Sequence, residues 1–241
     1  MRVLALDTTT RSGSAALVED DRIVDEQSGD GARTHALRMP AEIVDLAAAH
    51  HWPLPEIDLF AVASGPGSFT GLRIGIATIQ GIAFVHGRRV VAVPALEAMA
   101  YAAARTLPAE TLLGVWLDGY RQDVFTALYR VTAAGPFSRA RLAAIDAPAV
   151  GAPEATLERW RTLTGADPAA VVGDGAVLYT PELTRHAPRA VVIPPPQLAG
   201  VIGLLAVDRA KDAVEPSAVR PFYVRRPDVE VLREKNARAG H

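Results

Sequence analysis

The segments VLALDTTTRSGSAALV (residues 3–18) and LGVWLDGYRQDVFTALY (residues 113–129) decide the fold, because they share one pattern. In each, an aliphatic run ends in an aspartate, a short polar turn follows, and a second apolar run begins. The pattern predicts a strand, a hairpin turn and a second strand. A repeat at a spacing of about 110 residues indicates two related lobes. We expect Asp7 and Asp118, which end the first strand of each copy, to point into a cleft between the lobes.

Shorter patterns extend these hairpins into alternating strands and helices. Aliphatic runs between turn residues indicate strands, and apolar positions three and four residues apart indicate helices. The first half is expected in the order β-β-β-α-β-α-β-α, and the second half follows it less clearly. We expect strands at 3–7, 14–18, 22–27, 58–64, 89–93, 112–117, 124–131, 141–145, 169–172 and 190–193, and helices at 37–50, 72–86, 96–105, 154–163, 176–185 and 198–213.

The chain has 241 residues, which suits one large domain or two small lobes. We expect an N-terminal lobe at residues 1–105 and a C-terminal lobe at 106–197. A helical segment near 198–224 is expected to pack back between the lobes. A basic tail at 225–241 is expected to contribute little to folding. It is either a solvated segment or a segment that attracts nucleic acid electrostatically.

The composition excludes several classes of protein. Cysteine is absent, so the sequence carries no disulfide framework, thiolate metal site or cysteine nucleophile. The formal net charge of −2 gives no overall basic footprint for nucleic acid. No apolar run approaches the roughly 18 residues that span a bilayer, and the apolar stretch at the N-terminus is too short for a signal peptide. We therefore expect a cytoplasmic protein without membrane contact.

The string SGPGSFTGLRIG (residues 64–75) is the strongest local signal. It lies between an expected strand and an expected helix, and its glycines permit positive φ or close approach of the backbone. Ser68 or Thr70 would cap the helix, whose free N–H groups form an anion site. The string is not a P-loop, because no Lys-Ser/Thr pair follows the glycines, and its G-x-G-x-x-x-G spacing is not the dinucleotide fingerprint. A turn that binds nothing is the alternative for the isolated loop.

Five motifs together resemble the bacterial TsaB (YeaZ) family, and they extend over nearly the whole chain. The resemblance implies an α/β fold of two ribonuclease-H-like lobes in the actin/sugar-kinase/Hsp70-like ATPase superfamily, which agrees with the repeat. The hairpin after Asp118 departs from the usual D-A-R-x-G-E-V-Y pattern, because Gly119 and Tyr120 replace the Ala-Arg pair. Any role that rests on an arginine at position 120 is therefore in doubt. The motifs are LALDTT (4–9), GPGSFTGLRIG (65–75), PALE (94–97), the aspartate hairpin at 118 and RPFYVR (220–225).

The resemblance implies work in the synthesis of threonylcarbamoyladenosine, the modified adenosine beside the anticodon of tRNAs that read ANN codons. In that pathway the paralogue TsaD carries a metal and transfers the threonylcarbamoyl group to the adenosine N6. TsaB-type proteins pair with TsaD and are needed for its activity. We therefore expect a non-catalytic scaffold subunit, a pseudo-enzyme that forms a homodimer when alone. It would join TsaD and a TsaE-type ATPase in a complex and reach tRNA only through that complex.

The superfamily resemblance also implies a nucleotide-like cleft. Asp7 and Asp118 could hold Mg²⁺, which leaves weak binding of ATP or ADP with magnesium open, and we expect no tightly bound cofactor. The alternative for Asp7 is a hairpin-turn aspartate that accepts hydrogen bonds from nearby backbone N–H groups. The expected cleft residues are Asp7, Thr8, Thr9, Gly65, Gly67, Ser68, Asp118, Gly173, Asp174 and Gly175.

The residues themselves favour a role without catalysis. The catalytic paralogue has a His-x-x-x-His metal site on its first helix, whereas His35 is followed four residues later by Met39. A thioether does not replace an imidazole for a hard or borderline divalent ion. We expect no catalytic residue and no tightly bound transition metal, with His35 a capping or surface histidine. The competing class is an independent enzyme of the same fold, either an ATPase or kinase or a metallopeptidase-like protein.

The helix expected at 72–86 is apolar on most sides and must be covered on most sides. One face packs on its own sheet. The other needs a neighbour, which is either the helix at 37–50 within the lobe or the matching helix pair of a partner, and the family resemblance favours the partner. Gly71, Gly75 and Thr78 would permit close approach of a partner helix. We expect the shared surface at Leu37, Ala41, Val44, Ala48, Leu72, Ile76, Ile79 and Ala83, and a second face of the later helix at Ile74, Ala77, Gly81 and Phe84.

Overall fold

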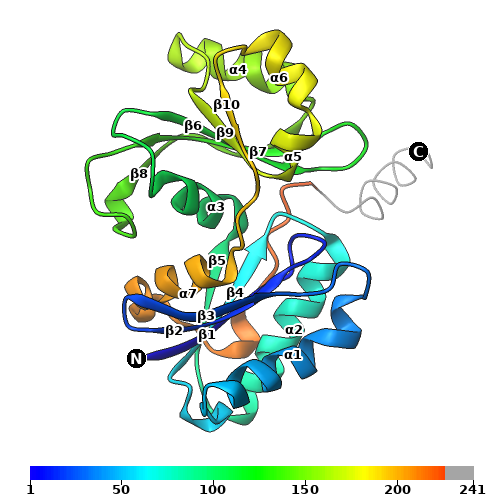
Figure 1. Cartoon of the computed structure of the whole chain (residues 1–241), viewed down its shortest axis with the longest axis vertical. Helices are drawn as coiled ribbons and strands as arrows, with labels where there is room; N and C mark the ends of the chain where they lie inside the picture. The colour runs from blue at the N-terminus through cyan, green and yellow to red at the C-terminus, as the bar shows by residue number, and fades with distance from the viewer. Residues whose placement is uncertain (226–241) are drawn as a thin grey trace, which may run out of the picture.

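The computed structural model describes residues 1–225, and the rest of the expected basic tail lies outside the described residues. Two mixed five-stranded sheets are stacked along the long axis of the molecule (Figure 1). The first has the order β3-β2-β1-β4-β5 and the second has the order β10-β9-β6-β7-β8. The strands are β1 (Arg2–Asp7), β2 (Ser14–Glu19), β3 (Arg22–Ser28), β4 (Leu59–Gly65), β5 (Val90–Pro94), β6 (Leu112–Asp118), β7 (Val124–Val131), β8 (Leu142–Gly151), β9 (Ala170–Val172) and β10 (Val191–Ile193).

The two sheets repeat one topology, which confirms the predicted two-lobed α/β fold. In each, the first three strands in sequence pair antiparallel, and the fourth and fifth add in parallel on the other side of the first. Asp7 lies opposite Ser14, and Asp118 lies opposite Val124, in the last pair of each first hairpin. The two aspartates therefore occupy equivalent positions at the carboxyl ends of β1 and β6.

The helices form three layers around the two sheets (Figure 1). The outer face of the first sheet is covered by α1 (His35–Ala49) and α2 (Phe69–Val85). The helices α3 (Ala95–Ala104) and α7 (Ala199–Asp208) lie between the sheets, α3 mainly against β6 and β7 and α7 against β1, β2 and β4. Each of these two helices thus follows the last strand of one sheet and packs on the other sheet. The outer face of the second sheet carries α4 (Pro153–Thr164), α5 (Asp174–Leu178) and α6 (Thr180–His186).

The aliphatic strands are apolar throughout because both faces of each sheet are buried. Along β1, Leu4 and Leu6 enter the core under α1 and α2, whereas Val3 and Ala5 face α7. The core around α3 and α7 is continuous from β1 to β9, so the two lobes share it. Alternate side chains of β1 therefore pack into the layer of α3 and α7 that the two lobes share.

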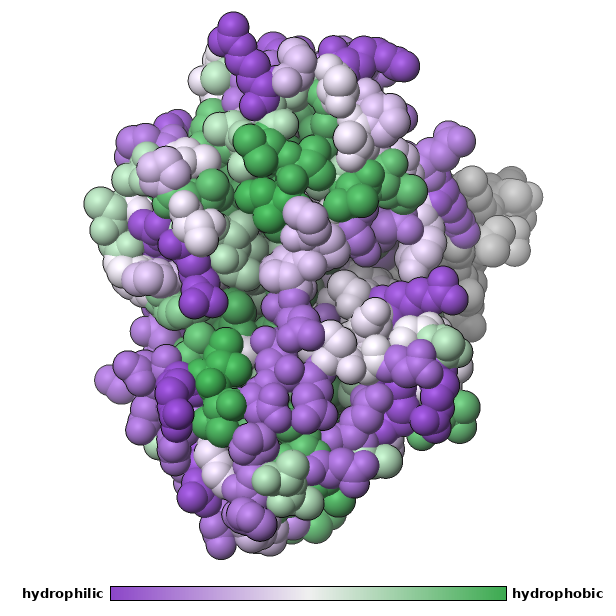
Figure 2. Space-filling model, viewed as in Figure 1, coloured by the Kyte–Doolittle hydropathy of each residue, from purple (hydrophilic) through white to green (hydrophobic). Residues whose placement is uncertain are grey.

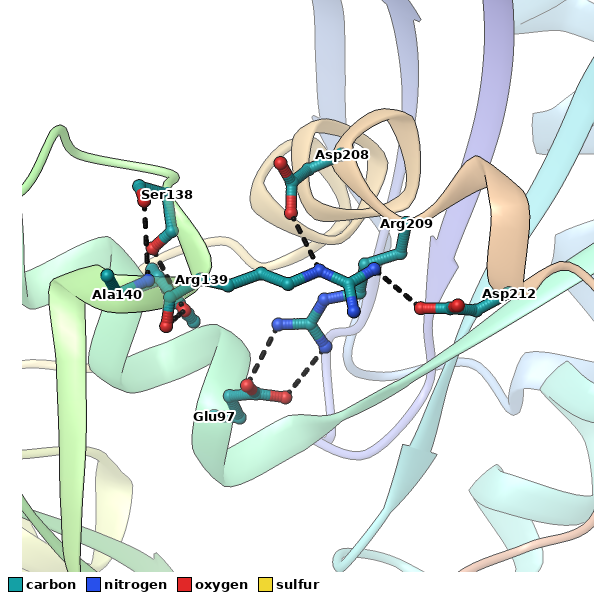
Figure 3. Close-up of polar contacts among 8 residues, drawn as sticks. Glu97, Ser138, Arg139, Ala140, Asp208, Arg209 and Asp212 are labelled. Atoms are coloured by element: carbon teal, nitrogen blue, oxygen red, sulfur yellow. Dashed lines mark hydrogen bonds and ion pairs between the residues drawn. The ribbon is translucent and has the colours of Figure 1, made fainter.

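Polar contacts reinforce this central layer on the side of the α7 carboxyl end (Figure 3). Arg209, which follows α7, donates two hydrogen bonds of 2.8 Å to the carboxylate of Glu97 in α3. Arg139 of the second lobe forms ion pairs with Asp208 and Asp212. The Glu97–Arg209 pair is bidentate and half-buried, so we expect it to stabilise the helix pair more than the exposed Arg139 contacts do.

The structure differs from the sequence-based prediction in the second half. The helix expected at 176–185 is two short helices, because Pro181 in the first turn of α6 has no N–H to continue a helix from α5. The helix expected at 198–213 ends at Asp208, and a 3₁₀ turn (Ala210–Asp212) follows. Within residues 1–225 no helix has the length and apolar character needed to cross a membrane. Apolar surface gathers over β10 and α5, where Val177, Leu178 and Val191 are exposed (Figure 2).

Candidate functional site

A cavity of about 620 Å³ lies where the carboxyl ends of β1 and β6 meet the amino end of α2. A second cavity, of about 300 Å³, shares Asp174 with the first and includes Asp7. The structure therefore brings residues from the expected cleft set in both lobes to one place. Those that line the larger cavity are Thr9, Gly67, Ser68, Asp118 and Asp174.

Asp7 is buried and holds the turn that follows β1. One of its carboxylate oxygens accepts a hydrogen bond of 2.9 Å from the Thr9 N–H and one of 2.6 Å from the Thr9 hydroxyl. Burial raises the pKa of the Asp7 carboxyl, and the two hydrogen bonds from Thr9 oppose that shift. Asp7 thus adopts the hairpin-turn arrangement that the sequence left open as an alternative.

Asp118 and Asp174 are joined across the start of α5. The Asp174 carboxylate accepts hydrogen bonds from the N–H groups of Asp118 (3.0 Å) and Gly175 (2.8 Å). The Asp118 carboxylate accepts a hydrogen bond of 2.8 Å from the Tyr120 N–H. Burial raises the pKa of Asp174, and those backbone hydrogen bonds lower it. Both carboxylates line the larger cavity, so they are the groups that could meet a magnesium-bound or other cationic ligand there.

Four of the expected cleft residues line neither cavity: Thr8, Gly65, Gly173 and Gly175. Gly173 has a φ of +127°, and a Cβ there would lie 2.0 Å from the Trp116 carbonyl oxygen. A side chain at this position would push α5 away from the end of β6. Ser68 is the N-cap of α2 as predicted, because its hydroxyl accepts a hydrogen bond of 3.2 Å from the Gly71 N–H.

His35 is neither a capping nor a surface histidine, which corrects the prediction. It is the first residue of α1, after the N-cap Thr34, and it is buried. Its Nδ1 lies 2.8 Å from an Arg38 Nη atom, and its Nε2 lies 3.0 Å from the Thr10 carbonyl oxygen. Because a guanidinium only donates, Nδ1 accepts and Nε2–H donates to Thr10. Burial lowers the pKa of His35, which keeps the ring neutral.

Sequence reasoning missed several residues that line the larger cavity, among them Arg11, Arg33 and Tyr120. Tyr120 is 59% exposed and lies on the hairpin after β6, where the sequence departs from the family pattern. That departure was the available signal for Tyr120. Arg33 lies in a loop whose sequence carries no motif. Its place in the cavity lining follows only from the position of that loop near α2 in the folded structure.

The two faces of α2 are assigned oppositely to the prediction. Leu72, Ile76, Ile79 and Ala83 are at most 4% exposed, so they are not an outward surface. Ile76, Ile79 and Ala83 lie in the core under α1 and α2. Ala77 and Gly81 are exposed, Ile74 is partly buried, and Phe84 is 78% exposed. On α1 the prediction of an outward face holds for Leu37, Ala41, Val44 and Ala48, all of which are exposed.

The small residues of α2 also serve a different contact from the one expected. A Cβ at Gly71 would lie 2.2 Å from the Thr8 carbonyl oxygen, and a Cβ at Gly75 would lie 2.2 Å from the Thr8 hydroxyl oxygen. These glycines therefore allow α2 to approach the turn after β1 within the lobe. A Cβ at Gly81 would meet no atom of residues 1–225 within 4 Å, which agrees with the place of Gly81 on the outward face.

Comparisons with known proteins find likeness to the TsaD and TsaB families. A model of the tRNA N6-adenosine threonylcarbamoyltransferase family (TsaD) matches residues 26–145. The chain is 33% identical over 165 residues to the tRNA threonylcarbamoyladenosine biosynthesis protein TsaB of Escherichia coli (strain K12), and the alignment covers 68% of each chain.

Solved structures show the same likeness over more of the chain. The crystal structure of an uncharacterized Pseudomonas aeruginosa protein with similarity to peptidase YeaZ superposes with a TM-score of 0.76 at 28% identity, over 93% of this chain and 99% of that one. Component A of the Acidaminococcus fermentans (R)-2-hydroxyglutaryl-CoA dehydratase superposes with a TM-score of 0.51 at 11% identity, over 88% and 99% of the two chains. The second likeness concerns the fold alone.

Proposed function

The chain belongs to the TsaB (YeaZ) family of tRNA threonylcarbamoyladenosine biosynthesis proteins, and from that premise we propose that it is a non-catalytic scaffold subunit. In this proposal it supports the catalytic paralogue TsaD, which adds threonylcarbamoyl to the N6 of the adenosine beside the anticodon of tRNAs that read ANN codons. The chain forms a homodimer when alone, joins TsaD and a TsaE-type ATPase in the cytoplasm, and meets tRNA only through that complex.

The observation that carries the proposal is an outward apolar surface on α1 and α2, which we call the α1–α2 face. The two helices pack against each other, yet each keeps apolar side chains in solvent. Leu37 is 71% exposed, Val44 is 52% exposed and Phe84 is 78% exposed. Exposed apolar side chains on two helices that pack against each other support an interaction site. The face consists of Leu37, Ala41, Val44, Ala48, Ala77, Gly81 and Phe84. Ile74 is partly buried and lines the larger cavity.

The surroundings of His35 support the absence of a catalytic metal. Its Nδ1 is occupied by the positively charged guanidinium of Arg38, which stands where a cation would bind. Met39, at the position of the second imidazole in the paralogue, is fully buried in the core of the lobe. A metal at His35 would have to displace Arg38 from a buried position, which costs several kcal/mol.

The carboxylates support weak nucleotide binding at most. Asp7, Asp118 and Asp174 each accept hydrogen bonds from their own turns, so binding a magnesium ion would compete with contacts that hold those turns. The cavity between the lobes nevertheless has room for a ligand of nucleotide size. We propose that ATP or ADP with magnesium binds there weakly and that the protein alone does not turn it over.

The test combines one assay on the isolated protein with one on a mixture. We expect the purified chain to show no sustained ATP turnover and no stoichiometric zinc or iron after dialysis without chelator. We expect it to co-purify with TsaD from the same organism and to be required for threonylcarbamoyl transfer to tRNA. Turnover at about 1 s⁻¹ or faster by the chain alone would favour the alternative, an independent ATPase, kinase or metallopeptidase-like enzyme.

A further inference from the structure

The motif RPFYVR (residues 220–225) is not explained by the proposed function. In the structure, this segment contacts both lobes. The chain crosses α2 before the motif begins, because the Gln80 side chain donates hydrogen bonds to the carbonyl oxygens of Pro216 (2.8 Å) and Val219 (3.2 Å). Val219 is buried in the core of the first lobe. From there the chain runs to the other lobe, and we call residues 219–225 the strap.

The middle of the strap is bound to the amino end of α2. The Phe222 N–H donates a hydrogen bond of 2.7 Å to the Ser64 carbonyl oxygen at the end of β4. The Tyr223 ring lies 5.4 Å from the Phe69 ring, and the Arg73 guanidinium lies 3.9 Å from the centre of the Phe69 ring. The Arg73 Nε–H donates a hydrogen bond of 3.0 Å to the Tyr223 hydroxyl. Arg73 is exposed, so this cluster reaches the solvent side of α2.

The end of the strap is bound to the second lobe. Arg225 donates a hydrogen bond of 2.8 Å to the Gly119 carbonyl oxygen and forms an ion pair with the Asp123 carboxylate. Its guanidinium also lies 5.8 Å from the centre of the Phe125 ring in β7. All three partners belong to the hairpin between β6 and β7 or to the strand that follows it. The strap therefore ties α2 to that hairpin.

The hairpin needs such support because its backbone is unfavourable. Tyr120, Arg121 and Gln122 have φ values of +56°, +57° and +66°, which places three successive non-glycine residues in the left-handed region. The left-handed region is unfavourable for residues that carry a Cβ atom. The hairpin presents Asp118 and Tyr120 to the larger cavity. A contact that holds the hairpin therefore also holds one wall of the cavity.

We propose that the strap couples the solvent face of α2 to the cavity between the lobes, with Arg225 and Arg73 as positioning residues. Arg73 lies one helical turn before Ala77, so a partner seated on the α1–α2 face covers both. A partner that covers Arg73 restricts the motion of Tyr223, to which Arg73 donates a hydrogen bond. The strap then restricts the hairpin through the contacts of Arg225 with Gly119 and Asp123. Linkage makes the coupling reciprocal: a ligand that orders the hairpin favours the partner, and the partner favours the ligand. Only the part that concerns a partner rests on the proposed function.

Hydrogen exchange of the hairpin amides in the full chain tests the coupling without any partner or ligand. Arg225→Met should raise the exchange rates of the Gly119 and Asp123 amides roughly fivefold, because a charge-assisted hydrogen bond and a partly exposed ion pair are lost. Arg73→Met, which changes no residue of the cavity or the hairpin, should raise the same rates by about threefold, and Tyr223→Phe should do likewise. Arg105→Met is the matched control, because Arg105 also lies over an aromatic ring, that of Phe137, and is exposed.

The coupling is refuted when Arg73→Met and Tyr223→Phe leave the hairpin rates equal to those of the Arg105→Met control. A second arm adds TsaD: the wild-type hairpin should exchange more slowly in the complex, and Tyr223→Phe should halve that protection or more. A complex that forms without protecting the hairpin overturns this inference and leaves the proposed function standing. Failure of the wild-type chain to bind TsaD overturns the proposed function, and the exchange rates of the isolated variants still decide the role of the strap.

Discussion

The two hairpin turns that face the inter-lobe cavity are equivalent in topology and are held in different ways. The turn after β1 is fixed from within its own lobe, because Arg38 of α1 donates to the Ser12 carbonyl oxygen and to His35, which in turn binds Thr10. The turn after β6 is fixed from the other lobe by Arg225. The Arg38 side chain is 1% exposed and the Arg225 side chain is 27% exposed. One wall of the cavity is thus part of a core, whereas the other depends on the strap.

The largest effect on stability is expected from removing the buried contacts of Arg38 with Ser12 and His35. Arg38→Met should lower the free energy of unfolding by about 3 kcal/mol, because it leaves the Ser12 carbonyl and the His35 Nδ1 without their buried donor. Urea unfolding followed by circular dichroism measures the change. Arg22→Met, at a 71% exposed side chain, is the control and should change stability by less than about 0.5 kcal/mol. Equal losses for the two variants would remove the contrast between the turns.

A smaller effect on stability should follow from protonating His35. Because burial lowers the pKa of His35 in the folded state, the unfolded chain binds the proton more readily. The contribution of neutral His35 to the free energy of unfolding is therefore complete above the unfolded-state pKa of about 6.5. It is lost as the pH falls from there through the pKa of the folded state. Over that window the free energy of unfolding should fall by up to about 1.4 kcal/mol per pH unit.

The variant His35→Gln removes this titration and should flatten the pH dependence below about pH 6.5. Unfolding curves at a series of pH values, for wild type and variant in the same buffers, provide the measurement. His51→Gln is a suitable control, because His51 is exposed. Parallel pH profiles for wild type and His35→Gln would mean that His35 is not held neutral by its surroundings.

The smallest effect on global stability is expected from the strap. Arg225→Met should lower the free energy of unfolding by less than about 1 kcal/mol, because a partly exposed ion pair contributes little. The same variant should loosen the turn after β6 and leave the turn after β1 unchanged, and residue-resolved hydrogen exchange distinguishes the two. A loss of stability as large as that of Arg38→Met would show that both turns belong to one cooperative core.

The sequence predicts the sheets well for a physical reason. Strands buried on both faces are aliphatic throughout, and the paired Asp-turn segments at 3–18 and 113–129 mark the repeat. It also predicts part of the lining of the larger cavity, because the carboxyl ends of β1, β4, β6 and β9 and the starts of the following helices recur in both lobes. The predicted residues that line it are Thr9, Gly67, Ser68, Asp118 and Asp174.

Orientation is what the sequence leaves undetermined. The helix α2 is apolar on nearly all sides, so hydrophobicity does not tell its inner face, with Ile76 and Ile79, from its outer face, with Ala77 and Phe84. The deciding contacts are those of Gly71 and Gly75 with Thr8, which are distant in sequence. The hydrogen bond between Arg38 and His35 is predictable from the sequence, because residues three apart on a helix are neighbours.

The most direct test of the proposed scaffold role compares two exposed alanines on helices. Ala77→Glu places a charge on the α1–α2 face, and Ala155→Glu places the same charge on α4 of the second lobe. Both variants should keep the circular dichroism spectrum of the folded chain. Sedimentation equilibrium should show that Ala77→Glu weakens self-association and TsaD binding at least roughly a hundredfold, because the charge is desolvated in an apolar contact, while Ala155→Glu associates like wild type. A folded Ala77→Glu variant that associates as tightly as Ala155→Glu would contradict the account.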